Sequence, residues 1–174
     1  MSGGRDRIWL VAFLAACFGA ATVGGWSTSR SVNTWYQTLH KPSFSPPDWV
    51  FGTVWTVLYA AMAVAAWLVR READRTPARA TVGRQALVAW GVQLALNVAW
   101  SAVFFGQRRI GAAVVVLAAL WTAIAVCVER SARVSRGAAL LLLLYLAWTS
   151  FAAALNVRIW QLNPPAASTR DAQD

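Results

Sequence analysis

The chain has 174 residues, of which 58% are hydrophobic and 13% are charged, and its mean hydropathy is +0.47. This composition excludes an ordinary soluble domain and a disordered chain, and two Cys are too few for a disulfide-stapled secreted fold. The formal net charge is nevertheless +9 and there are eleven Trp, so apolar segments must alternate with short basic ones. That profile is typical of a small polytopic membrane protein.

Five apolar stretches lack Asp, Glu, Lys and Arg, and each has the roughly 20 residues that a helix needs to cross a bilayer. They are residues 8–28, 49–69, 85–107, 110–128 and 137–157. A membrane barrel is disfavoured because its strands would alternate over segments of about ten residues. The sequence therefore predicts an all-α membrane protein, a bundle of five transmembrane helices that forms one domain over residues 1–165, followed by a polar tail at 166–174.

The connections between these spans carry the charge. If the N-terminus is placed on one side, that side holds ten Lys and Arg residues and the other holds six. The positive-inside rule then predicts a cytoplasmic N-terminus. Because the Arg residues flank spans, the charge is interpreted as a topology signal, and no nucleic-acid partner is expected. The connection at 107–109 is so short that the third and fourth spans should be antiparallel neighbours.

A possible processing signal lies at the start of the chain. Leu14-Ala15-Ala16-Cys17 fits a lipoprotein cleavage box, and Arg5 and Arg7 would form its basic region. The apolar run continues well past Cys17, however, so a full membrane span is favoured over cleavage.

The predicted spans contain no ionisable residue, whereas ion-coupled carriers place such residues inside the membrane. A coupled pump is therefore disfavoured. The single His, His40, lies between the first two spans, so it supplies neither a pair of haem ligands nor a Ser, His and carboxylate set. No cluster has metal-ligand spacing, and we expect neither a metal nor a cofactor.

Aromatic and polar residues recur at helical spacing in the second, third and fifth spans. They are Trp49, Trp55 and Tyr59, then Gln93, Asn97, Trp100, Ser101 and Phe104, and finally Tyr145, Trp148, Thr149, Ala152 and Asn156. Three such stripes predict a shared interior. The amides of Gln93, Asn97 and Asn156 would serve either as hydrogen-bonding glue between helices or as ligand contacts.

The Trp residues divide by their depth in the spans. Trp9, Trp26, Trp67 and Trp160 lie at span ends and are interpreted as interfacial anchors. Four others lie too deep for that role and either fill the core or form the wall of a pocket. These are Trp55, Trp100, Trp121 and Trp148.

The segment between the first two spans, residues 35–49, contains three Pro and four aromatic residues. These residues stiffen the backbone, so a flexible tether is excluded. The segment is either a rigid connector on the membrane surface or a lid over the bundle, and the two roles are compatible. Pro46 and Pro47 suit the first turn of the second span, where a missing N–H is harmless.

These residues carry a family resemblance. The matching positions are Trp35-Tyr36, Lys41-Pro42, Pro46-Pro47, Trp49-Val50-Phe51, Val54-Trp55-Thr56, Leu58-Tyr59, Gln93-Leu94, Asn97, Trp100-Ser101, Phe104-Phe105, Tyr145-Leu146, Trp148, Phe151-Ala152 and Leu155-Asn156. With them the chain resembles the tryptophan-rich sensory protein and mitochondrial translocator protein family, TspO/MBR. The resemblance implies a five-helix membrane protein, often a homodimer, that binds porphyrins, sterols and synthetic aromatic ligands under its first loop.

The resemblance also implies a set of pocket residues, which the helical stripes extend by Trp49, Tyr59 and Phe104. The expected ligand-binding set is Tyr36, Pro46, Trp49, Trp55, Tyr59, Asn97, Trp100, Phe104, Trp148 and Ala152. In bacterial members the positions that match Trp55 and Trp148 are linked to light-dependent breakdown of protoporphyrin. The family's sterol pattern needs a Tyr before a basic residue, and 155–158 has none, which weakens cholesterol as a ligand.

We therefore expect a receptor or sensor for porphyrins such as protoporphyrin IX, in the inner membrane of a bacterium and without enzymatic activity. A light-dependent porphyrin-degrading enzyme that uses Trp55 and Trp148 is one alternative. A transporter of tetrapyrroles or sterols is another, and a purely structural role is a third. The expected partners are a hydrophobic small molecule, the lipid bilayer and a second copy of the chain.

Overall fold

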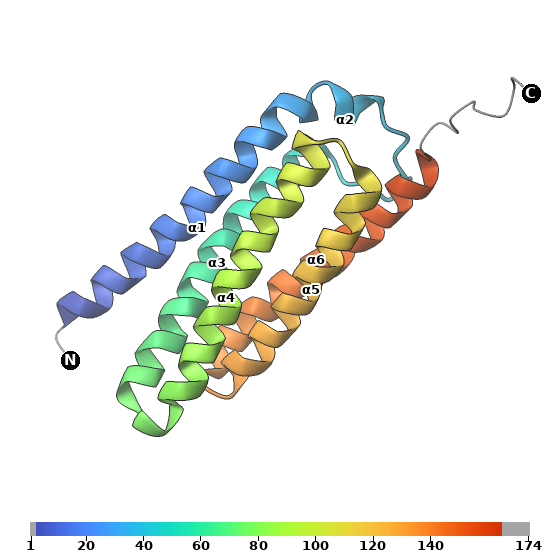
Figure 1. Cartoon of the computed structure of the whole chain (residues 1–174). Coiled ribbons are helices and arrows are strands. Elements are labelled where there is room, and N and C mark those ends of the chain that lie inside the picture. Colours follow the sequence, from blue (N-terminus) through green and yellow to red (C-terminus); the bar gives the residue numbers. More distant parts are fainter. Residues whose placement is uncertain (1–2, 165–174) are drawn as a thin grey trace, which may run out of the picture.

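The computed structural model describes residues 3–164, which form a bundle of long helices (Figure 1). The elements are α1 (Gly3–Val32), α2 (Trp35–Thr38), α3 (Asp48–Arg75), η1 (Pro77–Arg79), α4 (Ala80–Ser101), η2 (Ala102–Gly106), α5 (Ile110–Ala132) and α6 (Arg136–Leu162). Within this part of the chain there is no strand, and five helical segments are long and apolar enough to cross a membrane. The predicted fold class is confirmed. The predicted tail at 166–174 lies outside the described residues.

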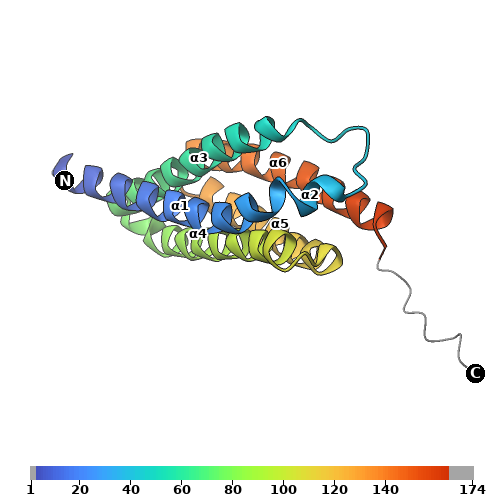
Figure 2. The same ribbon diagram turned by 90° about the horizontal axis from the view of Figure 1, so that it is seen from above.

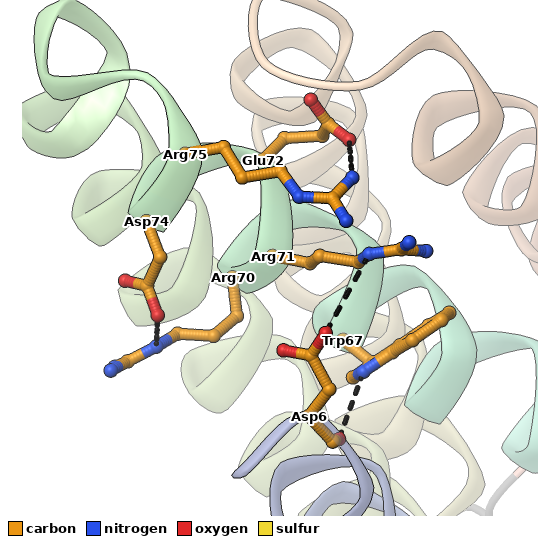
Figure 3. Close-up of polar contacts among 7 residues, drawn as sticks. All are labelled: Asp6, Trp67, Arg70, Arg71, Glu72, Asp74 and Arg75. Atoms are coloured by element: carbon orange, nitrogen blue, oxygen red, sulfur yellow. Dashed lines mark hydrogen bonds and ion pairs between the residues drawn. The ribbon is translucent and has the colours of Figure 1, made fainter. Parts of the chain in front are cut away.

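The helices are longer than the charge-free stretches from which they were predicted. α1 begins at Gly3 and α3 ends only at Arg75, so both carry charged residues in their end turns. Ion pairs support these turns at the end of α3, where Arg70 contacts Asp74 at 3.0 Å and Arg75 contacts Glu72 at 3.6 Å (Figure 3). The charge-free stretch marks only the part of a helix that lies in the apolar core of the membrane. The helix itself continues beyond that core, where its charged side chains are solvated or paired.

The same region ties α1 to α3. The indole N–H of Trp67 donates to the carbonyl of Asp6 at 3.1 Å, and Arg71 lies 3.8 Å from the Asp6 carboxylate (Figure 3). Arg70 also lies 4.4 Å above the ring of Trp9. These contacts attach the first turns of α1 to the last turns of α3.

Short connections determine which helices are neighbours. α4 and α5 pack side by side and antiparallel across the turn at 107–109, as predicted, and α5 also packs along α6 (Figure 1). α1 packs against α3 and α4, and α3 in turn contacts α6. The view from above shows α2 following the end of α1, and the chain leading to α3 curving round this end of the bundle near the last turns of α6 (Figure 2).

α1 contacts the bundle through small residues seven positions apart, namely Cys17, Gly24 and Ser31, and these are its buried residues. A Cβ added at Gly24 would lie 3.3 Å from the hydroxyl oxygen of Ser101, so glycine permits the close approach of α1 to α4. The Ser31 hydroxyl donates to the Phe105 carbonyl at 2.7 Å. α1 is therefore held by close packing and one hydrogen bond along this seam.

The Phe105 carbonyl is free for Ser31 because it lies in the last turn of the helix, which ends in the π-helical turn η2. In η2 the amide of Gln107 bonds to the Ala102 carbonyl at 2.8 Å, five residues back. The sequence had suggested a regular helix to residue 107. The wider turn rotates Phe104 and Phe105 so that both lie against Tyr36, with ring centroids 6.3 Å and 5.7 Å away.

Candidate aromatic binding cavity

A cavity of about 320 Å³ lies among α1, α3, α4 and α6, next to α2. Its aromatic walls come from α1, α2, α3, α4 and η2. The aromatic residues that line it are Phe18, Tyr36, Phe51, Trp55, Tyr59, Trp100, Phe104 and Phe105. Its polar lining consists of Thr28, Asp48, Thr56, Asn97, Ser101 and Asn156. The cavity is thus mostly aromatic, with a few neutral polar groups and one carboxylate.

The aromatic rings on one side of the cavity lie nearly parallel. The rings of Trp55 and Trp100 are 6.4 Å apart at 29°, and those of Trp100 and Phe104 are 5.6 Å apart at 28°. Tyr59 lies beside Trp55 at 5.8 Å. Such pairs contribute about 0.5–1.5 kcal/mol each beyond the area that they bury. The result is a continuous row of closely packed aromatic rings along one side of the cavity.

A buried chain of hydrogen bonds connects three helices beneath this wall. The Tyr59 hydroxyl donates to the Asn97 side-chain oxygen at 2.7 Å, and the Asn97 amide donates to the Tyr145 hydroxyl at 2.8 Å. Asn97 and Tyr145 are fully buried, at 1% and 0% exposed. Asn97 therefore joins α3 to α6 through α4 and also lines the cavity.

A second amide orients the wall. The Trp100 indole donates to the Asn156 side-chain oxygen at 3.0 Å, and the Asn156 amide donates to the carbonyl of Ile110 at 3.3 Å. Gln93 does not line the cavity, and its amide nitrogen lies 3.6 Å from the Met62 sulfur. All three amides thus connect helices, as one of the two interpretations proposed, while Asn97 and Asn156 also face the cavity.

The segment that precedes α3 closes one end of the cavity. Tyr36 is 5% exposed, and the Lys41 ammonium lies 4.2 Å above its ring. Lys41 donates to Gln37 at 3.2 Å, and Gln37 donates to the Asp48 carboxylate at 2.7 Å. Burial, reinforced by the Asp48 charge, raises the pKa of the Tyr36 hydroxyl above its ordinary value. The hydroxyl therefore stays protonated at neutral pH.

This roof is also fastened to the far end of α6. The Asn163 side chain accepts a hydrogen bond from the His40 amide at 3.0 Å and donates one to the His40 carbonyl at 2.9 Å. A side chain that satisfies both backbone groups of one residue holds the loop in a single position. The segment is therefore a rigid connector and, because Tyr36 and Asp48 line the cavity, also a cover over it.

The structure brings most of the predicted site residues together. Those that line the cavity are Tyr36, Trp55, Tyr59, Asn97, Trp100, Phe104 and Ala152. Trp49 does not, because it lies on another face of α3 and is 72% exposed. Pro46, in the roof, and Trp148 are also absent from the lining. Whether any of these residues binds a ligand stays a prediction.

Trp148 lies behind the cavity wall. Its ring packs against Phe51 at 5.9 Å and Phe151 at 5.3 Å, and of these rings Phe51 lines the cavity. Within residues 3–164 its indole N–H has no hydrogen-bond partner. Trp121, expected in the core or a pocket wall, is instead 40% exposed on α5 and donates to Ser150 at 2.8 Å.

Sequence reasoning missed the contributions of α1 and of Phe105. Phe18, Gly25 and Thr28 line the cavity from α1, where no aromatic stripe marked a functional face. Phe105 lines the cavity from the π-helical turn η2, next to Phe104. Among the described residues, no three His, Cys, Asp or Glu side chains group closely enough to hold a metal ion.

Comparisons with known proteins agree with this architecture. A family model described as the TspO/MBR family matches residues 12–161. The chain belongs to the TspO/MBR family. The resemblance expected from the sequence is thereby confirmed, and with its five apolar helices this family member is an integral multi-pass membrane protein.

Named TspO/MBR relatives align over most of the chain. The tryptophan-rich protein TspO of Chlorobaculum tepidum is 39% identical over 160 residues, which cover 92% of this chain and 99% of the relative. The tryptophan-rich sensory protein of Cereibacter sphaeroides is 35% identical over 158 residues, covering 91% and 93%. The human translocator protein is 40% identical over 148 residues, covering 83% and 86%.

The hydrogen-bonded core yields a stability prediction. Tyr59→Phe should leave the buried Asn97 oxygen without its donor and lower the free energy of unfolding by about 1–3 kcal/mol. Asn97→Leu should cost at least as much, because it leaves two tyrosine hydroxyls without their partner. The double variant should lose less than the sum, by about 0.5–3 kcal/mol, since the Tyr59 hydroxyl and the Asn97 oxygen disappear together and only the Tyr145 hydroxyl stays without its partner.

Reversible unfolding in mixed micelles measures all three variants. Thr53→Val is the control, because its hydroxyl bonds only within α3 on an exposed face, and it should change stability by less than about 0.5 kcal/mol. Strictly additive effects of Tyr59→Phe and Asn97→Leu would contradict the coupling.

Proposed function

We propose that the protein is a membrane receptor or sensor that binds porphyrins such as protoporphyrin IX in the aromatic cavity. The observation that carries the proposal is the nearly parallel wall of Trp55, Trp100 and Phe104. A porphyrin offers two large π faces, and one of them would stack on such a wall. The volume of about 320 Å³ is within the range of roughly 300–1,000 Å³ that is usual for ligand pockets.

The polar groups of the site favour a ligand with a polar edge toward the roof. The interior hydrogen-bonding groups of Asn97 and Asn156 are already paired within the protein, so the flat apolar part of the ligand would lie against them at little cost. Lys41 lies over Tyr36 at the roof, where its ammonium would pair with a propionate. Two relatives are named tryptophan-rich sensory protein and translocator protein, and these names support a role in recognition.

Photochemical degradation of the bound porphyrin is the second candidate. It is supported by Trp55, which lines the cavity and stacks on Trp100. An electron would therefore cross only a short distance from an indole to an excited macrocycle in the cavity. Trp148 lies behind Phe51 and supports this candidate less. For transport, the one carboxylate in the described lining of the cavity, Asp48, lies in the first turn of α3 and not midway along a span, where an ionisable relay would be expected.

The membrane and the orientation follow from charge. We propose an inner membrane location with a cytoplasmic N-terminus, because the structure places the start of α1, the α3 to α4 connection and the α5 to α6 connection at one end of the bundle (Figure 1). These are the segments that hold the larger share of the Arg residues.

A membrane-impermeant thiol reagent should fail to label Arg75→Cys from outside intact cells and should label Arg108→Cys; the reverse pattern would overturn the orientation.

We also propose a homodimer, in which exposed small residues allow close helix packing. The candidate packing face consists of the small residues Gly111, Ala118, Ala119 and Ala123 of α5, of which Ala118 and Ala119 are exposed. A Cβ added at Gly111 would lie 2.9 Å from the Trp160 indole nitrogen, so Trp160 already covers that position, and Ala123 lines a separate groove between α4 and α5. Light scattering that gives the mass of a single 18.9 kDa chain would contradict the dimer.

A porphyrin titration tests the proposed function. Trp55→Ala should raise the dissociation constant for protoporphyrin IX by about tenfold, which corresponds to roughly 1.4 kcal/mol of lost stacking. Trp49→Ala is the matched control, because it removes the same side chain from an exposed face of the same helix and should leave the constant unchanged. The Soret band reports binding in both variants.

Equal weakening by the two substitutions would mean that porphyrin only partitions into the micelle, and it would contradict the cavity. The same samples under illumination separate receptor from enzyme. Turnover of the Soret band that is lost in Trp55→Phe, with binding retained, would favour degradation, whereas binding without turnover supports the receptor.

A further inference from the structure

A second depression lies outside the aromatic cavity and shares no lining residue with it. It is a groove of about 640 Å³ between α4 and α5. Its apolar residues are Val88, Ala89 and Val92 on α4 and Ala123 and Val126 on α5. Val88 is 62% exposed, Val92 48% and Val126 46%, so the groove is open to whatever surrounds the bundle.

Two guanidinium groups from facing helices line the same groove. Arg84 lies on α4 and Arg130 on α5. Arg130 is held across the two helices, because it donates to the Gln85 side-chain oxygen at 2.9 Å and lies 3.0 Å from the Glu129 carboxylate. Arg84 forms no ion pair with any residue in the range 3–164.

The charges around this point do not balance. Glu129 is the carboxylate partner of both Arg130 and Arg133. Arg84 and Arg130 line the groove, and Arg130 shares the single carboxylate of Glu129 with Arg133, so these four side chains together carry a net charge of +2. An anion would balance this charge, and phosphate oxygens match the donor geometry of guanidinium groups.

The dimensions of the groove match one leaflet of a bilayer. Arg84 and Val92 are eight residues apart on α4, which corresponds to about 12 Å along a helix. Half of the hydrocarbon core is roughly 15 Å. The cations therefore lie near the headgroup level when the valines lie beside the acyl chains, and one amphiphile would meet both parts of the groove.

We propose that this groove binds one anionic glycerophospholipid, with its phosphate on Arg84 and Arg130 and an acyl chain along Val88, Val92 and Val126. Free phosphate would leave the apolar part of the groove unused. A zwitterionic lipid would bring an ammonium group toward the net positive end. A basic pocket between transmembrane helices is a recognised form of site for acidic headgroups, and the site does not depend on the porphyrin cavity.

The test compares phosphatidylglycerol with phosphatidylcholine of the same acyl chains on the purified full-length protein. Native mass spectrometry measures the number of bound lipids and their dissociation constants. The wild type should bind one phosphatidylglycerol in preference to phosphatidylcholine. The double variant Arg84→Gln with Arg130→Gln should weaken phosphatidylglycerol binding by at least about tenfold, since each surface cation contributes about fivefold, and should leave phosphatidylcholine unchanged.

The control is Arg5→Gln with Arg75→Gln, which removes the same charge from the same end of the bundle but outside the groove. It should retain the tight phosphatidylglycerol. Val92→Trp, at an exposed position, should weaken the same lipid by filling the groove while both arginines remain. An equal loss in the control pair would show general attraction to the positive end and would overturn the site.

A second copy of the chain is the rival occupant of this face. Disulfide formation between two Val92→Cys chains, together with a phosphatidylglycerol count that the arginine substitutions leave unchanged, would assign the groove to a protein interface and overturn the proposal. Loss of phosphatidylglycerol in the arginine double variant at an unchanged oligomeric state supports it.

Discussion

The arrangement of the bundle depends on a single buried amide. Asn97 accepts a hydrogen bond from Tyr59 on α3 and donates one to Tyr145 on α6, at 2.7 Å and 2.8 Å. In the membrane interior no water competes for these groups, so each partner left unpaired carries the full cost of its desolvation. These two hydrogen bonds fix the positions of α3, α4 and α6 relative to one another along the bundle. Trp55 lies one turn from Tyr59 on α3, and Trp100 lies one turn from Asn97 on α4. Their rings therefore stack on each other, with centroids 6.4 Å apart.

The cavity wall formed by α1 is built differently. α1 takes no part in the Asn97 network and rests on small residues, with Gly24 beside Ser101 and Ser31 on the Phe105 carbonyl. That carbonyl belongs to the terminal π-helical turn η2, which also presents two phenylalanine rings to Tyr36. The hydrogen-bonded helices α3, α4 and α6 form a preformed aromatic surface on one side of the cavity. α1, which is held mainly by packing, forms a separate wall on the other side. Such a division suits a hydrophobic ligand, because the core need not reorganise when it binds.

Sequence periodicity was sufficient for the five spans, because long apolar runs directly reflect burial, and aromatic residues at helical spacing identified Trp55, Tyr59, Trp100 and Phe104, which line the cavity. It failed where a side chain's direction depends on more than spacing. Trp148 shares a stripe with Ala152 but packs behind Phe51, and Phe105 lines the cavity from η2, a turn that departs from α-helical geometry. The contribution of α1 was hidden for a further reason, since packing through glycine and serine carries no hydrophobic signal.

A crystal structure of the protein with protoporphyrin IX would test the central claim most directly. The account predicts the macrocycle against Trp55 and Trp100, with Tyr59, Asn97 and Tyr145 in the same hydrogen-bonded arrangement as in the free protein. A macrocycle bound on the outer surface near Trp49, or one that enters only when the Asn97 network is broken, would contradict it.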